Sequence, residues 1–294
     1  MAGFRFLRLS LPFLALLAAA HFTPAQNQQV TLSPSIVVAG APEIIRVSAV
    51  DADSVTGEWS GNTLAFFRPG NRGPWVALAG VDVGVETGPS TLHIVVHTSN
   101  GATRELTQTV EILPAHYRTT RLSVAPKFVE PDSEQLKIIL AERSLKDKIF
   151  SESAPERLWH GSFHAPVHAV ATASFGTRRT FNGTLASIHK GMDYRARTGT
   201  VVRASNDGVV VLARKLYYEG NIVVIDHGLG LYTMSMHLSR IDVREGQHVT
   251  TDEKIGLSGA TGRVTGPHLH WAVRWRNAYL DPAKMLRMNL SNLR

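Results

Sequence analysis

The chain has 294 residues, contains no cysteine and carries a formal net charge of +7. The absence of cysteine excludes disulfides, thiolate metal sites and lipid attachment at an N-terminal cysteine. The length is sufficient for two domains that are each held by a hydrophobic core. Basic residues are in excess in the C-terminal half, but they do not alternate with aromatic residues as in a nucleic-acid-binding surface, so we expect no nucleic-acid partner.

The N-terminal segment has the pattern of a secretory signal peptide. Arg5 and Arg8 precede an apolar run over residues 11–20, and Thr23-Pro24-Ala25 offers a cleavage site of small residues. A membrane anchor is the alternative, but the apolar run is shorter than the ~20 residues that span a bilayer. We therefore predict that residues 1–25 direct export and are removed, which leaves no transmembrane segment.

Residues 26–115 have the pattern of an all-β domain. Short apolar or alternating runs are separated by turns that contain glycine and proline, as at Ala39-Gly40-Ala41-Pro42. Turn signals recur at intervals of about 8–12 residues, which is typical of a small immunoglobulin-like β-sandwich. Strands are expected over residues 30–32, 44–47, 76–78, 92–96 and 107–112.

Residues 116–165 are predicted to be a linker that contains one amphipathic helix. Asp132 can cap this helix, and Gln135 lies three residues later, as a capping box requires. We expect the helix to pack on one of the two domains through an apolar stripe at helical spacing. The expected stripe consists of Leu136, Ile139, Leu140, Arg143 and Ile149.

Residues 166–294 again combine strand patterns with glycine-rich turns. Helix signals are few in this part, so we predict a compact antiparallel β domain and a chain that is mainly β overall. Gly246, Gly256 and Gly259 are expected in turns. Strands are expected over residues 200–203, 208–213, 221–226, 231–237 and 269–275.

Two histidine-containing motifs in this region suggest a metal site. Side chains alternate between the two faces of a strand, so His268 and His270 should point the same way. The same argument puts His189, Gly191 and Asp193 on one face, with the glycine leaving room between the other two. Two imidazoles and one carboxylate would make a zinc site with an open fourth position, which is typical of catalytic zinc.

These motifs belong to an ordered series that resembles the lysostaphin/LytM-type zinc endopeptidases, which cut peptide cross-links in bacterial peptidoglycan. The resemblance covers residues 166–294 and implies an open antiparallel sheet whose groove holds the metal. It assigns the zinc ligands to His189, Asp193 and His270, and the non-ligand catalytic histidines to His237 and His268. The series includes Ser174-Phe175-Gly176-Thr177-Arg178, His189-Lys190-Gly191-Met192-Asp193, Met236-His237-Leu238-Ser239 and Thr265-Gly266-Pro267-His268-Leu269-His270.

The resemblance also implies a function and a compartment. We expect a zinc (Zn²⁺) metalloendopeptidase, a hydrolase that acts on peptidoglycan peptide stems in the periplasm or cell envelope. The N-terminal domain would contact the wall, another cell-wall hydrolase, or a division or elongation protein. Arg178 is a candidate for binding a substrate carboxylate, with a structural salt bridge as the alternative.

Two other functions remain open at this point. Some relatives lose their metal ligands and act as non-enzymatic regulators of other cell-wall hydrolases, but the ligand positions are intact in this chain. A D-alanyl carboxypeptidase uses a related set of histidine and aspartate ligands. The Gly-Pro-His-Leu-His motif in a predicted strand favours the endopeptidase.

Overall fold

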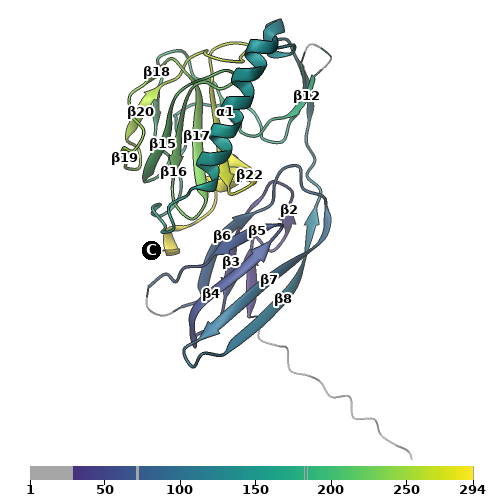
Figure 1. The fold of residues 1–294 in the computed structure, drawn as a ribbon, viewed down its shortest axis with the longest axis vertical. Coiled ribbons are helices and arrows are strands. Elements are labelled where there is room, and N and C mark those ends of the chain that lie inside the picture. Colours follow the sequence, from purple (N-terminus) through teal and green to yellow (C-terminus); the bar gives the residue numbers. More distant parts are fainter. Residues whose placement is uncertain (1–28, 71–72, 182, 184, 294) are drawn as a thin grey trace, which may run out of the picture.

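The computed structural model describes residues 29–70, 73–181, 183 and 185–293 (Figure 1). The predicted signal peptide, residues 1–25, lies outside the described residues. Within the described part of the chain, no helix is long and apolar enough to cross a membrane. The structure is mainly β, as predicted, with one long helix.

The N-terminal part of the chain forms two sheets. Their buried side chains belong to one hydrophobic cluster, which includes Ile45 from one sheet and Leu92 and Ile94 from the other. All neighbouring strands are antiparallel except β2 and β8. The sheets have the orders β1 (Val30–Ser33), β3 (Pro42–Val47), β6 (Trp75–Gly80), and β2 (Val37–Val38), β8 (Thr103–Leu113), β7 (Gly88–Thr98), β4 (Ala52–Trp59), β5 (Asn62–Ala65).

The five strands expected in this region are present, but β2, β4 and β5 were not predicted. Strand β4 buries Ala52, Val55 and Trp59 while four of its other residues are exposed. This spacing does not alternate strictly, because the register with β7 shifts between Ala52 and Ser54. A bulge of this kind removes the period of two that sequence reasoning depends on.

The long helix α1 (Ser133–Ser151) begins with the predicted capping box. Asp132 Oδ1 accepts a hydrogen bond of 2.8 Å from Gln135 N, and Gln135 Oε1 accepts one of 3.3 Å from Asp132 N. The predicted apolar stripe is wrong in its first half, since Leu136 and Leu140 are 47% and 54% exposed.

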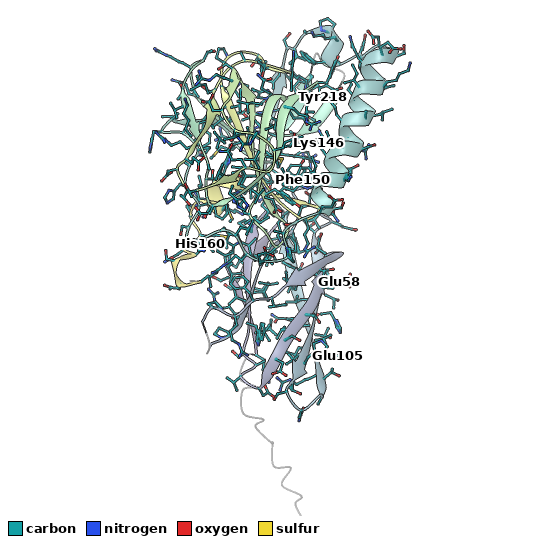
Figure 2. The ribbon with its side chains drawn as sticks, turned by 60° about the vertical axis from the view of Figure 1, so that its left-hand side comes forward. Glu58, Glu105, Lys146, Phe150, His160 and Tyr218 are labelled. Carbon is teal, nitrogen blue, oxygen red and sulfur yellow. The ribbon has the colours of Figure 1, made fainter. Side chains whose placement is uncertain are left out.

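The second half of α1 makes the contacts with the rest of the protein. Leu145, Ile149 and Phe150 pack on a buried cluster of the C-terminal sheet, and Phe150 and Lys146 are labelled in Figure 2. Lys146 pairs with Glu219, which lies in a turn between two strands of that sheet. The helix therefore belongs with the C-terminal sheet, whose face it covers in Figure 1.

The C-terminal part is built on one antiparallel sheet of eight strands. Alternate residues of β21 point to opposite sides, so Leu269 and Trp271 are fully buried in the main core while His270 and Ala272 face the side on which α1 packs. The strand order is β10 (Ala171–Ala173), β13 (Met192–Tyr194), β21 (Leu269–Trp275), β17 (Leu231–Leu238), β16 (Gly220–Asp226), β15 (Gly208–Leu216), β19 (His248–Val249), with β22 (Ala278–Leu280) paired to β21.

Two small sheets and three short helices complete this part. Gly256 lies in strand β20, so its predicted position in a turn is wrong. The sheets have the orders β14 (Val201–Arg203), β20 (Lys254–Leu257), β18 (Arg240–Ile241), and β12 (Leu185–Ile188), β11 (Arg178–Phe181), β9 (Thr119–Leu122). The short helices are η1 (Pro126–Phe128), α2 (Pro282–Met285) and η2 (Ser291–Leu293).

Strand β9 lies in the segment expected to be a linker. It pairs in parallel with β11, so that Thr120 lies opposite Arg179. The approach to β9 is also fixed, because Tyr117 Oη donates a hydrogen bond of 2.7 Å to the carbonyl oxygen of Ala39. A Cβ atom on Gly176 would lie 2.0 Å from the Tyr117 ring, so only glycine permits this approach. The start of the predicted linker is therefore part of the folded structure.

The N-terminal and C-terminal sheets also meet directly. Tyr279 N donates a hydrogen bond of 2.8 Å to Asp82 Oδ1, and Asp281 N donates one of 2.7 Å to the carbonyl oxygen of Gly40. A Cβ atom on Gly80 would lie 2.5 Å from the side chain of Leu280. These contacts anchor the segment after β22 to the N-terminal sheets.

Candidate active site

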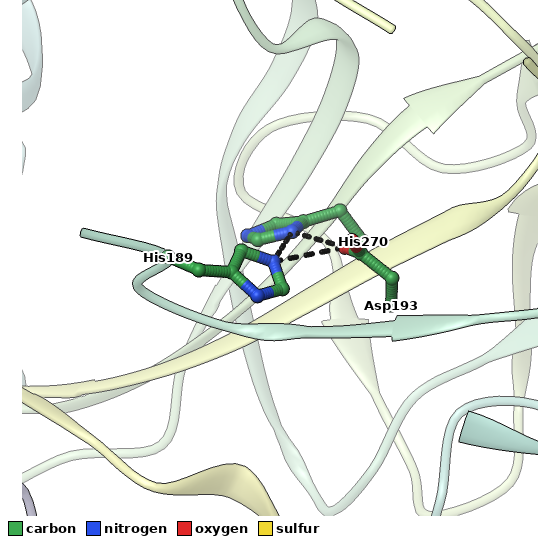
Figure 3. Close-up of side chains that lie close together, drawn as sticks. All are labelled: His189, Asp193 and His270. Atoms are coloured by element: carbon green, nitrogen blue, oxygen red, sulfur yellow. Dashed lines mark hydrogen bonds and ion pairs between the residues drawn. The ribbon is translucent and has the colours of Figure 1, made fainter. Parts of the chain in front are cut away.

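Three side chains converge where β13 and β21 run side by side. Asp193 lies opposite His270 in the register of these strands, and His189 precedes β13. Asp193 Oδ1 is 2.7 Å from His270 Nδ1 and 3.0 Å from His189 Nε2. The two ring nitrogens are 2.9 Å apart (Figure 3). Three atoms that can each bind a metal ion therefore face a common point.

The reason for this convergence differs from the one expected. His189 and Asp193 do not share a strand, since β12 ends at Ile188 and β13 begins at Met192. The chain bends at Gly191, where an added Cβ atom would lie 2.5 Å from His270 Nε2. The glycine therefore leaves room for the ring of His270, and the bend, rather than strand alternation, brings His189 to Asp193.

Each of the three side chains is oriented by a further contact or by its neighbours. His189 Nδ1 donates a hydrogen bond of 2.9 Å to the carbonyl oxygen of Ser174, which leaves Nε2 facing the other two groups. Arg179 Nη2 donates one of 2.6 Å to Asp193 Oδ2, which leaves Oδ1 facing the histidines. Contacts of this kind fix the ring tautomer and the carboxylate orientation around metal sites in proteins.

The charges of these groups suit a cation. Burial lowers the pKa of His189 to about 4, so its imidazole is neutral at neutral pH. Burial opposes ionisation of Asp193, but hydrogen bonds from His189 and His270 outweigh it and hold the pKa of this carboxyl below its ordinary value. Neutral imidazole and ionised carboxylate are the forms that bind metal ions.

Two further histidines lie beside this cluster. The ring centroid of His237 is 5.0 Å from that of His268 and 6.0 Å from that of His270. His237 Nδ1 donates a hydrogen bond of 2.9 Å to the carbonyl oxygen of Thr261, and His268 Nδ1 donates one of 2.8 Å to that of Gly266. In both rings Nε2 is thus the nitrogen without a hydrogen, and that of His268 lies 3.8 Å from Asp193 Oδ1. Burial, followed by the neighbouring His270 and His268, lowers the pKa of His237 to about 3.

The backbone of His237 has an unusual conformation. Its φ angle is +63°, in the left-handed region that residues other than glycine, asparagine and aspartate rarely adopt. The register between β16 and β17 shifts between Asn221 and Val223, and His237 N donates a hydrogen bond of 2.9 Å to the carbonyl oxygen of Glu219. Such local strain is concentrated at functional sites, and here it directs the imidazole toward His268 and His270.

The five residues lie in a cleft of about 1020 Å³. Met236 and Ala272 contribute both to this cleft and to the buried surface under α1, so the cleft and the helix occupy the same face of the C-terminal sheet. The walls come from β9, β11 and three loops. They include Arg118, Thr120, Leu122, Arg179, Phe181, Lys190, Tyr218, Glu219, Arg263 and Pro267.

The structure does not place Arg178 in this cleft. Arg178 is exposed, whereas Thr177, Arg179 and Phe181 line the cleft. Alternate residues of β11 point to opposite sides, so the candidate substrate-binding arginine of the sequence analysis is one residue away from the one that reaches the site. Strand β9 shows the same alternation, since Arg118, Thr120 and Leu122 line the cleft and the residues between them do not.

Arg179 and Arg263 were missed by the sequence analysis. The position of Arg179 could have been predicted from the strand alternation if the face of β11 had been known. Arg263 lies in the glycine-containing loop between β20 and β21, where no local pattern indicates a direction for the side chain.

The histidines between residues 160 and 168 lie outside the cleft. His160 pairs with Asp207, and His164 pairs with Asp252. His227 is fully buried, and its Nδ1 donates a hydrogen bond of 2.7 Å to the carbonyl oxygen of Asp207. These contacts indicate structural roles for His160, His164 and His227.

Comparisons with known proteins agree with this arrangement. The sequence pattern of Peptidase family M23 matches residues 187–282. Over 96 residues the chain is 49% identical to the Peptidoglycan DD-endopeptidase ShyA of Vibrio cholerae. This alignment covers 33% of this chain and 22% of ShyA. Over 98 residues it is 43% identical to the DD-carboxypeptidase/endopeptidase Mpg of Neisseria meningitidis. That alignment covers 33% of this chain and 23% of Mpg. The chain thus matches less than a quarter of the length of these two relatives.

A solved structure is similar over a larger part of the chain. This crystal structure, described as that of an M23 peptidase from Pseudomonas aeruginosa, has a TM-score of 0.66 and 26% sequence identity, and the match covers 85% of this chain and 94% of that one. The shared fold therefore extends beyond residues 187–282 into the N-terminal sheets. Residues 187–282 therefore carry the sequence pattern of peptidase family M23, as the lysostaphin/LytM-type motifs indicated, within a fold that is shared with an M23 structure.

Proposed function

We propose that this protein is a zinc-dependent endopeptidase that hydrolyses peptide cross-links of bacterial peptidoglycan. The observation that carries the proposal is the convergence of His189 Nε2, Asp193 Oδ1 and His270 Nδ1 within 3.0 Å of one another in an open cleft. The DD-endopeptidase activity of ShyA, whose sequence matches this segment, supports the same activity here.

The residues of the cluster fit zinc as ligands. Two imidazole nitrogens and one carboxylate oxygen are the donors of many catalytic zinc sites, which keep a fourth position open. The hydrogen bonds from His189 to the Ser174 carbonyl and from Arg179 to Asp193 are the outer contacts that such ligands require. Zinc held by these residues would lower the pKa of a bound water to about 7 and would polarise a peptide carbonyl.

The remaining residues of the site transfer protons and stabilise charge. His237 and His268 each present a free Nε2 toward the cluster, so one can accept a proton from water while the other donates a hydrogen bond to the developing oxyanion or a proton to the leaving amine. Arg179 holds Asp193 so that Oδ1 stays directed at the two histidine ligands.

A carboxypeptidase activity is the second candidate. Mpg, which is 43% identical over 98 residues, is named for both carboxypeptidase and endopeptidase activities. The cleft extends beyond the histidine cluster, since β9 and the Arg263–Pro267 segment also line it. A cleft that continues past the reacting bond accommodates a cross-linked peptide, which favours the endopeptidase over removal of a terminal residue.

We also propose a domain organisation for the chain. A signal peptide at residues 1–25 would direct the protein to the periplasm or cell envelope. Residues 26–115 would form an immunoglobulin-like sandwich that contacts the wall or a partner in cell division or elongation, which the common core of its two sheets supports. The peptidase domain, residues 166–294, would include β9 of the linker as well, since this strand pairs with β11.

Digestion of purified peptidoglycan by the full-length mature protein, with and without chelator, tests the proposal. Mass spectrometry of the products identifies the bond that is cut. We expect cross-linked muropeptides to be converted into monomers only when zinc is present. Release of terminal alanine alone would favour the carboxypeptidase, and no release unless another hydrolase is added would favour a regulator.

A further inference from the structure

We propose that Arg263 binds a free carboxylate of the peptide substrate and thereby sets the substrate preference of the cleft. The inference rests on the proposed peptidase function and names a residue that recognises the substrate. It is carried by three observations: the fixed position of Arg263 in the cleft, the two aromatic rings against its guanidinium, and the lack of an acidic partner.

The loop that carries Arg263 also positions both free histidines. The carbonyl oxygen of Thr261 accepts the hydrogen bond from His237, and that of Gly266 accepts the one from His268. Arg263 N donates a hydrogen bond of 2.8 Å to the carbonyl oxygen of Tyr218. Arg263 is therefore held in the wall of the cleft by the same loop that orients the proton-transferring groups.

Two rings hold the guanidinium in place. Its central carbon is 4.7 Å from the ring centroid of Phe181 and 4.4 Å from that of Tyr218. Phe181 belongs to β11, and Tyr218 lies in the turn between β15 and β16 (Figure 2). Contacts of this kind attract the cation to the ring faces. They leave the edge of the guanidinium, where its N–H groups lie, available to a ligand.

No acidic side chain in the described part of the chain pairs with Arg263. The acidic residues that line the cleft have other partners, since Glu219 pairs with Lys146 of α1 and Asp193 with Arg179. Arg263 is half-buried, and burial lowers its pKa although the nearby Tyr218 and Glu219 act in the opposite direction. A partly buried cation that makes no direct ion pair is costly to the folded protein, and an anionic ligand would reduce that cost.

The chemistry of the guanidinium indicates which anion this is. Its planar fork of N–H donors matches the two oxygens of a carboxylate, and such paired hydrogen bonds are both strong and directional. A peptide that is cross-linked through the side-chain amine of a diamino dicarboxylic acid carries a free carboxylate next to the cross-linking amide. A substrate carboxylate on Arg263 would orient the peptide relative to His237 and His268.

The test uses two soluble cross-linked muropeptides that differ only in whether the free carboxylate next to the scissile bond is intact or converted to a carboxamide. We expect the zinc-loaded wild-type protein to cleave the carboxylate form with a kcat/KM about 10- to 100-fold higher, the size of one charge-assisted hydrogen bond. Arg263→Gln should remove this preference by slowing cleavage of the carboxylate form alone. Arg178→Gln, on the outer face of β11, is the matched control and should keep the preference.

Arg263→Lys provides a second variant in case Arg263→Gln does not fold, which circular dichroism and thermal melting report. Lysine keeps the charge without the fork, so a reduced preference is expected. Equal cleavage of both peptides by the wild-type protein, or a preference that survives in Arg263→Gln, overturns the assignment of Arg263 alone. A wild-type protein that cleaves neither peptide contradicts the proposed peptidase function and this inference with it.

Discussion

Arg179 and Asp193 form a hydrogen-bonded ion pair in which Arg179 Nη2 lies 2.6 Å from Asp193 Oδ2. The other carboxylate oxygen, Oδ1, faces His189 and His270. The arginine thus occupies one oxygen of the carboxylate and leaves the second for a metal ion. Both side chains are largely buried, so solvent screens this pair much less than a surface ion pair.

Replacing Arg179 should therefore weaken zinc binding. Loss of an outer contact to a metal ligand typically costs about 10- to 100-fold in metal affinity, and we expect this for Arg179→Met. Competition with a zinc-binding dye measures the affinity directly. Arg178→Met, one residue away on the exposed face, is the control, and equal affinities for the two variants would refute the role of Arg179.

The two free histidines should be needed for hydrolysis and not for metal binding. Asparagine tolerates the left-handed backbone at position 237 better than alanine does, so His237→Asn and His268→Ala are the suitable variants. Each should retain zinc and lose activity by roughly 10²–10⁴-fold, the range for a general acid or base. Metal analysis on the same samples is the check. Loss of zinc from either variant would make that histidine a ligand.

Strand β9 offers a test of the cleft wall that does not touch the histidines. Thr120 lines the cleft and Thr119 does not, although both side chains are exposed. A tryptophan at position 120 should obstruct the substrate and lower kcat/KM on cross-linked muropeptides by roughly tenfold. Thr119→Trp should leave the rate unchanged. Similar rates for the two variants would show that substrate does not extend along β9.

The stability of the protein should depend on pH through His227. Burial lowers its pKa to about 4 from the ordinary value of 6.5, and its partners are the Asp207 carbonyl and the hydroxyl of Thr233. As pH falls below 6.5 the unfolded chain takes up the proton first, so the free energy of unfolding decreases down to about pH 4. Between pH 7 and pH 5 this amounts to about 2 kcal/mol.

Urea unfolding at these two pH values measures the effect, with His227→Gln as the comparison. Glutamine does not titrate, so the variant should be less stable at pH 7 but should lose about 2 kcal/mol less than the wild-type protein on going to pH 5. A pH dependence that is identical in the two proteins would show that His227 does not titrate on unfolding.

Several features of this protein could be predicted because they depend on local patterns. The capping box at Asp132 and Gln135 is a local hydrogen-bond pattern, and the structure confirms it. Strand β21 has the predicted bounds because a core-facing residue alternates with a cleft-facing one along its length. The order of the motifs along the chain was enough to indicate the peptidase family, because this order can be read without knowing how the chain folds.

Features that depend on contacts between distant segments could not be predicted. The bend at Gly191 exists because His270 occupies the space beside it. The choice between Arg178 and Arg179 depends on which face of β11 turns toward the sheet, and β9 becomes a strand only through its pairing with β11. The predicted apolar stripe of α1 is partly wrong because polar contacts also determine which side of the helix faces the sheet. Lys146 pairs with Glu219, and Glu142 accepts a hydrogen bond from Tyr217 N.

Hydrolysis should depend on zinc that is bound by His189, Asp193 and His270. The most direct test measures zinc content and cleavage of a purified cross-linked muropeptide in each of four samples: wild type, chelated wild type, chelated wild type with zinc restored, and His270→Ala. We expect stoichiometric zinc and cleavage in the wild type, loss of both on chelation and in His270→Ala, and recovery of both when zinc is restored. Full zinc retention by His270→Ala, or cleavage that continues after the metal is removed, would contradict the account.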